Sequence, residues 1–446
     1  MKTPICDFVK NYSEKAVIRA HMPGHKGKDI LGFETLDITE IRGADSLWEA
    51  NGIIEESEKN AGKLFGANTF FSTEGTSLCI KGMLYLCLQY AKRNGKEPII
   101  WAGRNAHKSF LSAIALLDMD VIWLTPKIRK SYLSCRISAE ELDEELARAE
   151  TLPVAVYITS PDYLGNISDI EGLSKVCHKY GVLLTVDNAH GAYLKFLPTS
   201  LHPIDFGADM CCDSAHKTLP ALTGGAYLHI SKEMPLETAG EAKRAMALFG
   251  STSPSYLVLQ SLDAVNAYID GGYAEKLREF TVALDECKKM LVDGGYILLG
   301  DEPLKLTVAA REYGYSGDEL AEFLAKKGIV CEFSDGEFTV MMLTPENGRE
   351  DVERIVAAML SVPKRAPIDT IRQECVKVRR AMSVRQAMFS VGEFVSIELC
   401  EGRVLAQPTV ACPPAVPILV SGELIDKQAI KMLEYYGIKE CFVVKK

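Results

Sequence analysis

The sequence predicts an α/β protein, with a large domain built on a mainly parallel β-sheet flanked by helices and a smaller α+β domain after it. Three observations support this prediction. Short apolar runs alternate with helical patterns over residues 50–235, as expected for strands that are joined through helices. The runs are apolar almost throughout, which is typical of strands buried on both faces. After residue 295 the pattern changes to shorter, mixed elements.

Seven runs predict the strands of the large sheet. In chain order they are TFF (69–71), IIW (99–101), VIWL (121–124), VAVYIT (154–159), VLLTVD (182–187), MCC (210–212) and AYLHI (226–230). Residues 170–180 carry apolar side chains at helical spacing, and Gly181 is a typical helix stop. Because the strands alternate with helices, we expect them to pair in parallel.

The later part of the chain predicts the smaller domain. Residues 255–295 predict one or two long helices, and residues 362–367 predict a linker. Strands are expected over 305–310, 329–333 and 338–343, and helices over 318–328 and 350–360. We therefore expect an N-terminal segment over residues 1–50, a large domain with the following long helices over 51–295, and a C-terminal α+β domain over 296–446.

Composition and charge limit the possible functions. The 446 residues have ordinary globular proportions and a net charge of −10 without a run of like charges, which argues against a nucleic-acid partner. No apolar stretch approaches the roughly 20 residues of a membrane span, and the N-terminus lacks the apolar core of a signal peptide. The 13 cysteines form no C-x-x-C pattern and are expected to be reduced thiols. We expect a cytoplasmic protein with no membrane partner and no metal site.

Polar side chains follow four of the predicted strands at their carboxyl ends, where open α/β sheets bind ligands. The four groups are Asp187 to His190, Ser214 to Lys217 with His216 between them, Gly75-Thr76-Ser77, and His107. A Gly-Thr-Ser sequence at the start of an apolar helix offers backbone N–H groups, hydroxyls and a positive helix end, which together suit an anion.

Each of these signals also has an ordinary structural explanation. Gly-Thr-Ser can be a plain helix cap, and Asp187 can cap a turn. His107 can be a surface histidine, and Lys217 can be a solvated lysine like most others. Together, however, they form a chemical set: an amine for an aldehyde, a carboxylate for a pyridine nitrogen, an imidazole for a ring face and a helix start for a phosphate. Pyridoxal 5′-phosphate (PLP) carries all four groups, so the set predicts this cofactor.

The sequence also resembles the bacterial ornithine/lysine/arginine decarboxylase family of fold-type-I PLP-dependent enzymes, in the short form without an N-terminal wing domain. The resemblance covers nearly the whole chain. It is carried by HMPGHKG (21–27), EESEKNAGKLFGA (55–67), STEGTS (72–77), GRNAHKS (103–109), TSPDYLGNISDI (159–170), DNAHGAY (187–193), DSAHKTLPALTGG (213–225), STSPSY (251–256) and CPPAVPILVSGE (412–423). It implies an aspartate-aminotransferase-like fold with PLP in the large domain. It also implies PLP-dependent decarboxylation of arginine, lysine or ornithine, through an external aldimine, to the amine and CO2.

The resemblance further implies a role for each residue of the set. Lys217 would form the Schiff base, Asp187 would pair with the pyridinium nitrogen and His107 would stack on the ring. Ala189 would pack beneath the ring, and His190 would belong to the same cofactor-binding group. The phosphate would be bound by Gly75, Thr76, Ser77, Ser214 and His216. A dry pocket would keep part of the Lys217 amine deprotonated, and Lys217 or a histidine would donate the proton to the product carbon.

Two motifs each allow a structural and a functional interpretation. In a homodimer or higher homo-oligomer of the family type, Thr252 and Ser253 would reach the phosphate of the partner subunit, although a simple helix cap explains these hydroxyls equally well. The segment HMPGHKG is either an exposed Pro-Gly turn or a segment near the mouth of the active site.

The chain departs from the family pattern at several positions. Glu74 stands where relatives have asparagine, and its carboxylate would repel the expected phosphate unless the side chain points away. Ile80 and Ala215 replace polar residues, and the C-terminal motif has Cys412 and Ser421 at positions where relatives have tyrosine and proline. Because that C-terminal segment lies near the substrate entrance in relatives, the identity of the basic substrate stays open, as does the acidic residue that binds its side chain.

Two other functions also stay open. The same residues could serve another fold-type-I reaction, that of an aminotransferase or an aldolase-type lyase. The altered positions Glu74, Ala215 and Cys412 instead suggest a non-catalytic relative that binds PLP or a basic amino acid.

Overall fold

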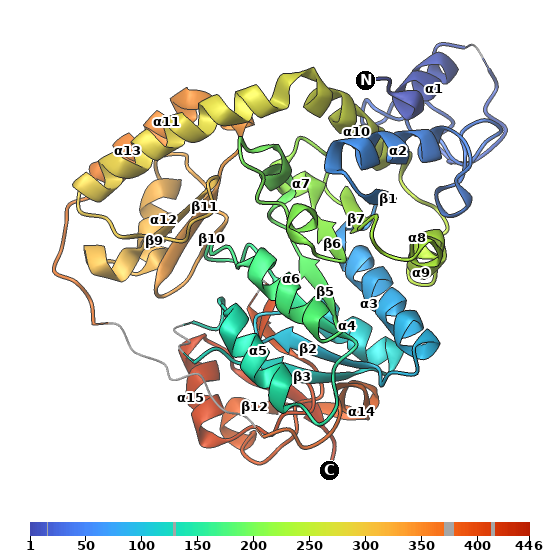
Figure 1. Ribbon diagram of the computed structural model, residues 1–446. Coiled ribbons are helices and arrows are strands. Elements are labelled where there is room, and N and C mark those ends of the chain that lie inside the picture. Colours follow the sequence, from blue (N-terminus) through green and yellow to red (C-terminus); the bar gives the residue numbers. More distant parts are fainter. Residues whose placement is uncertain (16, 128–130, 370–378, 412–414) are drawn as a thin grey trace. The chain divides into compact units, whose positions relative to one another are not determined.

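The computed structural model describes residues 1–15, 17–127, 131–369, 379–411 and 415–446 (Figure 1). Its internal contacts divide the chain into two compact units. The first unit contains residues 1–90 and 183–279, and the second contains residues 91–182 and 280–446. The domain boundaries expected at residues 50 and 295 stay a prediction. Among the described residues, no helix is both long and apolar enough to cross a membrane.

The first unit holds four of the seven strands predicted for the large sheet. They are β1 (Asn68–Ser72), β5 (Leu183–Asp187), β6 (Met210–Asp213) and β7 (Ala226–Ile230), which lie in the order β1-β7-β6-β5. β5 and β6 are parallel, whereas β7 is antiparallel to both β6 and β1. The strands are therefore confirmed within one or two residues, but the expectation of parallel pairing is wrong for β7.

The short connection between β6 and β7 explains this reversal. The connection of residues 214–225 contains no full helix, whereas a parallel crossover usually needs one. The connection contains a one-turn helix, α7 (Ala215–Thr218), where the sequence predicts only turn-forming residues. The chain thus returns beside β6 in the opposite direction, and α7 carries Lys217 at the turn.

The first unit contains several helices in addition to its strands. The main ones are α1 (Pro4–Ser13), α2 (Ile53–Phe65), α3 (Gly75–Arg93) and α10 (Tyr256–Tyr268), with the short α8 (Leu236–Gly240) and α9 (Ala242–Ala247). Ser255 caps α10 by accepting a hydrogen bond from the Val258 N–H, which fixes the end of the STSPSY motif. A π-helical turn (Ile269–Tyr273) joins α10 to α11 (Ala274–Asp293), so the long helical region predicted over 255–295 is confirmed.

The second unit contains the other three predicted strands. β2 (Ile99–Gly103) pairs in parallel with β3 (Asp120–Leu124) and with β4 (Ala155–Thr159). The connecting helices are α4 (Lys108–Leu117), α5 (Ala139–Arg148) and α6 (Ile170–Lys179). Strands joined through helices in this way give a mainly parallel α/β arrangement, as the sequence predicts.

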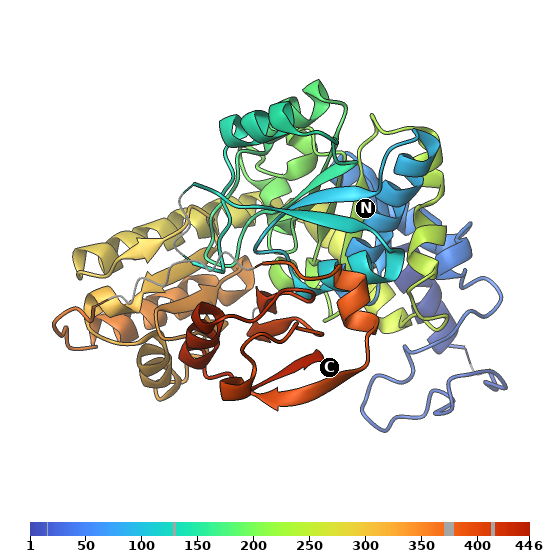
Figure 2. The same cartoon turned by 90° about the horizontal axis from the view of Figure 1, so that it is seen from below.

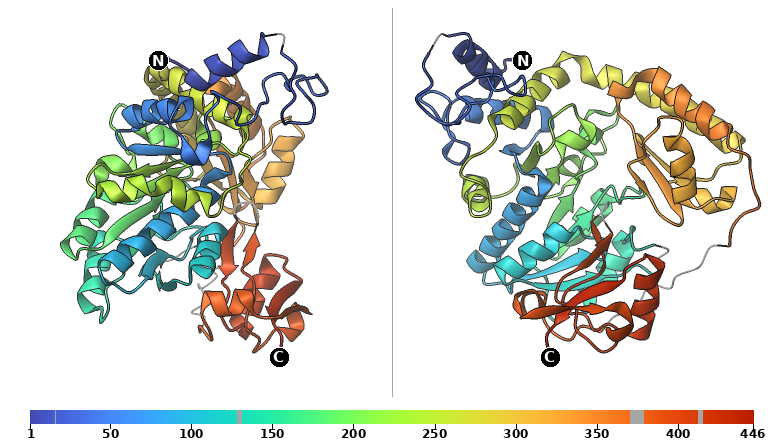
Figure 3. Two further views of the ribbon diagram at one scale, coloured as in Figure 1. Left: turned by 90° about the vertical axis from the view of Figure 1, so that its right-hand side faces the viewer. Right: turned by 180° about the vertical axis from the view of Figure 1, so that it is seen from behind.

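A second sheet of the second unit has the strand order β10-β11-β9-β8, and its neighbouring strands are antiparallel. Its strands are β8 (Leu298–Leu299), β9 (Lys305–Ala309), β10 (Phe333–Ser334) and β11 (Phe338–Met342), and its helices are α12 (Gly317–Ala325) and α13 (Gly348–Leu360). α13 lies alongside the C-terminal part of α11 (Figures 1 and 3), where Arg349 faces Glu286 at 3.9 Å.

The strand predicted over 329–333 is mostly wrong. Only Phe333 of this run is in β10. Gly328 has a positive φ of 78°, and the Ile329 N–H donates to the Leu324 carbonyl, so the start of the run closes α12 instead. Val330 is 90% exposed, which shows that an apolar run need not be a buried strand.

The C-terminal helices and strands (red in Figure 2) contribute to a core that they share with earlier residues of the second unit, among them Leu133, Leu164 and Val340. β12 (Gly392–Ser396) pairs with β15 (Glu440–Val444), and β13 (Thr409–Ala411) pairs with β14 (Val416–Leu419). The helices are α14 (Val384–Phe389) and α15 (Lys427–Tyr435). Leu433 of α15 and Val443 of β15 are fully buried in this core, together with Leu405.

Candidate active site

Three strand ends meet at one edge of the first unit. β5 and β6 are parallel, and two successive antiparallel pairings through β7 make β1 run in the same direction as β6. Their carboxyl ends therefore lie on the same side. The hydroxyl oxygens of Thr76, after β1, and Ser214, after β6, are 3.1 Å apart. The structure thus brings together two hydroxyls that the sequence analysis assigns to one phosphate.

The start of α3 faces open space. Gly75 has a φ of 69°, and a Cβ at this position would meet nothing within 4 Å. Its N–H donates to the Gly224 carbonyl at 2.8 Å, which ties the helix start to the loop after α7. At Gly224 a Cβ would lie 2.7 Å from the Thr73 carbonyl oxygen, so only glycine allows this approach. Thr76 and Ser77 are half-buried in the first turn, where the positive helix end favours an anion.

The carboxylate of Glu74 is held by the neighbouring loop. Glu74 is exposed, and its Oε1 accepts a hydrogen bond of 2.6 Å from the Ser251 N–H. The Ser251 carbonyl in turn accepts a hydrogen bond of 2.8 Å from the indole N–H of Trp48. This contact gives the acidic side chain a position of its own, so the departure from asparagine does not by itself argue against a bound phosphate.

The acid at the end of β5 is buried. Asp187 is 3% exposed, and its Oδ1 accepts hydrogen bonds from the Ala189 N–H at 3.3 Å and from the Cys212 thiol at 3.8 Å. The Ala189 carbonyl accepts a hydrogen bond from the Ser214 N–H at 3.3 Å. His190, next along the chain, is also buried. These contacts place the predicted ring-binding residues of β5 beside the predicted lysine turn of β6.

Lys217 and His216 lie on α7. Lys217 is half-buried, not fully enclosed as the sequence analysis expects of its amine. Burial lowers the pKa of His216, and the charge of Lys217 lowers it further. The Nδ1–H of His216 donates to the Gly225 carbonyl at 3.0 Å. The neutral ring therefore has its Nε2 free of hydrogen, and His216 must take up a proton before Nε2 can donate to a phosphate.

For three predicted site residues, these contacts do not test the expected role. Thr252 and Ser253 are exposed at the surface of the first unit, and their expected role toward a partner subunit stays a prediction. His107 belongs to the second unit, where it caps α4 by accepting a hydrogen bond of 3.1 Å from the Ser109 N–H. Its expected stacking on the cofactor ring also stays a prediction. Cys412 lies outside the described residues.

A buried polar network surrounds Asp213, the last residue of β6, and none of the sequence motifs predicts it. The Asp213 carboxylate accepts hydrogen bonds from His202 Nε2 at 3.0 Å, from His229 Nε2 at 3.2 Å and from Asn188 Nδ2 at 2.7 Å. Asp213, His202, His229 and Asn188 are all fully buried. His229 Nδ1 lies 2.9 Å from the Thr69 hydroxyl, which can donate to it. A carboxylate in this place needs such donors, because an unpaired buried charge is strongly unfavourable.

The network should make stability depend on acid pH. Burial alone would raise the pKa of the Asp213 carboxyl, but His202 and His229 outweigh it and hold that pKa well below its usual value. Since an aspartate in the unfolded chain has a pKa of about 4, the network contributes stability that is fully present above about pH 4 and declines as the pH falls further. The gap in unfolding free energy between wild type and Asp213→Asn should therefore stay constant near neutral pH and shrink below about pH 4. Urea unfolding at a series of pH values measures this gap, and a gap that is unchanged in acid would contradict the assignment.

A buried ion pair fixes the loop that carries His107. Both oxygens of Glu423 accept hydrogen bonds from the Arg104 guanidinium, at 3.1 and 3.0 Å, and both side chains are buried. Glu423 also accepts a hydrogen bond from the Val420 N–H, and the Lys108 N–H donates to the Ala415 carbonyl. The C-terminal motif is thus bound to the β2–α4 loop.

Removing one partner of this pair should destabilise the protein. Glu423→Ala leaves the Arg104 charge buried and unpaired, so we expect a loss of about 3 kcal/mol in unfolding free energy. The matched control is Glu275→Ala, which breaks an exposed pair with Arg278 and should leave the unfolding free energy nearly unchanged. Urea unfolding of both variants measures the difference, and equal effects would contradict the buried pair's importance.

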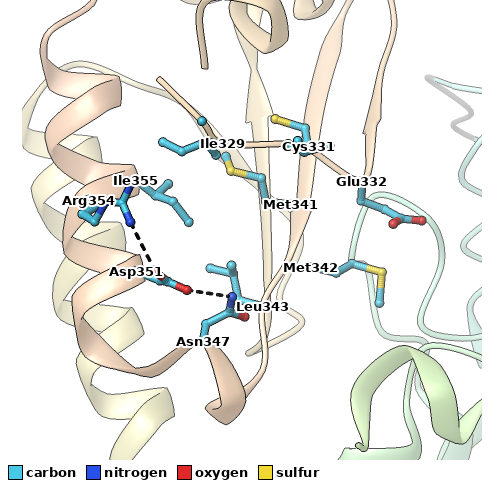
Figure 4. Close-up of a pocket in the computed structure, with 12 residues that line it drawn as sticks. Ile329, Cys331, Glu332, Met341, Met342, Leu343, Asn347, Asp351, Arg354 and Ile355 are labelled. Atoms are coloured by element: carbon cyan, nitrogen blue, oxygen red, sulfur yellow. Dashed lines mark hydrogen bonds and ion pairs between the residues drawn. The ribbon is translucent and has the colours of Figure 1, made fainter. Parts of the chain in front are cut away.

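A cavity in the second unit contains none of the predicted site residues (Figure 4). It has a volume of about 380 Å³ and lies beside α13 and β11, with Met341, Met342 and Arg354 in its wall. Arg354 faces Asp351 at 3.9 Å, and Asn347 donates to Asp351 at 3.5 Å. The arginine is thus engaged within the wall, and this cavity offers no set of groups for the predicted chemistry.

The fold is similar to that of solved lysine decarboxylases. The structure is similar to the crystal structure of the lysine decarboxylase LdcF of Francisella novicida, with a TM-score of 0.80 and 16% sequence identity. The similarity covers 99% of this chain and 81% of that one. It confirms the predicted fold class: a mainly parallel sheet flanked by helices and a smaller C-terminal part.

The sequence comparison defines the family. Residues 3–296 match the major domain of Orn/Lys/Arg decarboxylases, and residues 370–444 match the C-terminal domain of the same enzymes. The chain therefore belongs to the Orn/Lys/Arg decarboxylase family, as its motifs suggest. It is 28% identical to protein YaaO of Bacillus subtilis (strain 168), over 97% of this chain and 94% of that protein, and the name of that relative gives no activity. It is 27% identical to an arginine decarboxylase of the same organism, over 97% of this chain and 93% of that enzyme. The prediction of a decarboxylase of this type is confirmed.

Proposed function

We propose that this enzyme uses PLP to decarboxylate a basic amino acid, with arginine as the first candidate substrate. The observation that carries the proposal is the meeting of the Thr76 and Ser214 hydroxyls, 3.1 Å apart, at the edge of the sheet where β5 ends in a buried acid and α7 carries a lysine. Arginine is favoured over lysine and ornithine because the arginine decarboxylase of Bacillus subtilis is similar over nearly its whole length.

The residues of the first unit fit PLP by their chemistry. The open space in front of Gly75 and the two hydroxyls suit a phosphate. The amine of Lys217 suits an aldehyde, and the buried carboxylate of Asp187 suits a protonated pyridine nitrogen. These residues would hold the cofactor, which when bound supplies an electron-accepting ring for the bond between Cα and the carboxylate.

The chain's own groups then have distinct tasks. Asp187 keeps a proton on the ring nitrogen, and its burial strengthens that interaction because the local dielectric is low. The hydroxyls of Thr76 and Ser214, which are 3.1 Å apart, would donate to the phosphate of the bound cofactor and so help to hold it near Lys217. Lys217, half-buried on α7, can then donate a proton to the product carbon as a general acid.

A product assay tests this function. Purified protein with added PLP is incubated with arginine, lysine and ornithine, and the amine, CO2 and keto acid are measured separately. We expect equal amounts of amine and CO2 from arginine and no keto acid. Keto acid without CO2 would indicate an aminotransferase, and the absence of any product from PLP-loaded protein would indicate a non-catalytic relative.

A further inference from the structure

We propose that Asp213 is a positioning residue of the cofactor site, which acts through Asn188 and through its own place in front of Ser214. This inference rests on the proposed function, because it concerns the residues that hold PLP. The side chain of Asp213 does not belong to the predicted PLP-binding set. It lies one residue before Ser214 and bonds to the residue that separates Asp187 from Ala189.

The donor and the acceptor of each hydrogen bond to Asp213 can be assigned. An ionised carboxylate can only accept, so His202 and His229 must each carry a hydrogen on Nε2. The Nδ1 of His229 then accepts from the Thr69 hydroxyl, which comes from β1. The Nδ1 of His202 has no hydrogen-bond partner within the described part of the chain. Asp213 is thus the common acceptor of three donors.

The network joins the strand ends that supply the predicted site. Thr69 lies in β1, which leads to Gly75 and Thr76, and His229 lies in β7. Asp213 ends β6, and Asn188 follows β5. The Asp213 carboxylate, through its bond to Asn188, therefore links the carboxyl end of β6 to that of β5. Two backbone bonds, from Asn188 N–H to the Cys212 carbonyl and from Ser214 N–H to the Ala189 carbonyl, run beside it.

The chain provides a matched control at the other end of the same strand. Asp209 precedes β6, and its carboxylate accepts a hydrogen bond of 2.7 Å from the Leu184 N–H at the start of β5. Asp209 and Asp213 therefore both link β5 to β6, but only Asp213 does so at the edge with the predicted site. If Asp213 only stabilises the fold, substitution at either position should leave the PLP affinity of the folded protein unchanged, although Asp213 is the more deeply buried of the two.

The experiment compares Asp213→Asn, Asn188→Ala and Asp209→Asn with wild type. The affinity for PLP is measured by titrating each cofactor-free protein and following absorbance. We expect the dissociation constant for PLP to rise about 10- to 100-fold in D213N and N188A, as when residues that orient metal ligands are removed. D209N should stay within about twofold of wild type, because the bond that it affects, from the Leu184 N–H, lies at the opposite end of the β5–β6 pair. N188A keeps both histidine contacts of Asp213, so it tests the proposal even if D213N does not fold.

A second measurement does not depend on cofactor. Hydrogen–deuterium exchange of the cofactor-free proteins should be faster in residues 187–191 and 214–218 of D213N and N188A than in the same residues of D209N. Unchanged PLP affinity in folded N188A and D213N, or an equal loss in D209N, would overturn the positioning role. If wild type does not bind PLP, the proposed function fails, and the exchange pattern alone then decides whether Asp213 positions the two strand ends.

Discussion

Replacing Lys217 by alanine should abolish the attachment of PLP to the protein and nearly all decarboxylation. In the proposed function this lysine would supply both the covalent anchor and the proton donor, so we expect activity to fall by at least about 10⁴-fold, the upper end for loss of a general acid–base group. The fold should survive, because Lys217 is only half-buried on a one-turn helix at the edge of the unit. Borohydride reduction of the PLP-loaded protein, followed by peptide mass analysis, locates the anchored cofactor.

The control for this experiment is Lys59→Ala in the same unit. Lys59 forms an exposed ion pair with Glu55 and is not among the predicted site residues, so the cofactor should remain attached to this variant at residue 217. Cofactor that is still anchored in the K217A protein, or found on another lysine in wild type, would contradict the assignment. Circular dichroism of both variants separates a loss of the anchor from a loss of the fold.

Much of the fold could be predicted because its signals are local. The seven strands of the large sheet are short, apolar and bounded by turns or helices, and a buried position on both faces leaves such a run few alternatives. Strand direction is not local. The reversal of β7 depends on how the connection after β6 folds. The sequence does not show that its helix, α7, is a single turn. The strand prediction for residues 329–333 is wrong because Gly328 and Ile329 close a helix.

The candidate site likewise contains residues that the sequence could predict and residues that it could not. Asp187 ends β5, and Ser214 and Lys217 lie within four residues of the end of β6, so their position at the sheet edge follows from the fold class. His202 and His229 are 11 and 16 residues from Asp213 in sequence, one in a loop and one inside a strand. An inward histidine in an apolar strand such as AYLHI is the available signal, because a buried imidazole needs a polar partner. The identity of that partner requires the structure.

Replacing Asp187 by alanine should separate cofactor attachment from catalysis. The substitution removes the carboxylate that holds a proton on the ring nitrogen but leaves Lys217 and the hydroxyls of Thr76 and Ser214 in place. PLP should therefore still be anchored at Lys217, whereas turnover should fall by about 10²- to 10³-fold, as expected for loss of one preorganised electrostatic group. Amine formation from arginine at saturating PLP measures the turnover, and borohydride trapping measures the attachment.

The control is Asp205→Asn, which removes a partly exposed carboxylate of the same unit that pairs with Lys195. Since Asp187 also accepts a bond from the Ala189 N–H, the alanine variant tests whether its charge matters for chemistry or only for that turn. Asp187→Asn keeps an acceptor for the turn, so the two variants should be equally slow if the charge is what matters. Normal turnover in either variant would remove the role given to this acid.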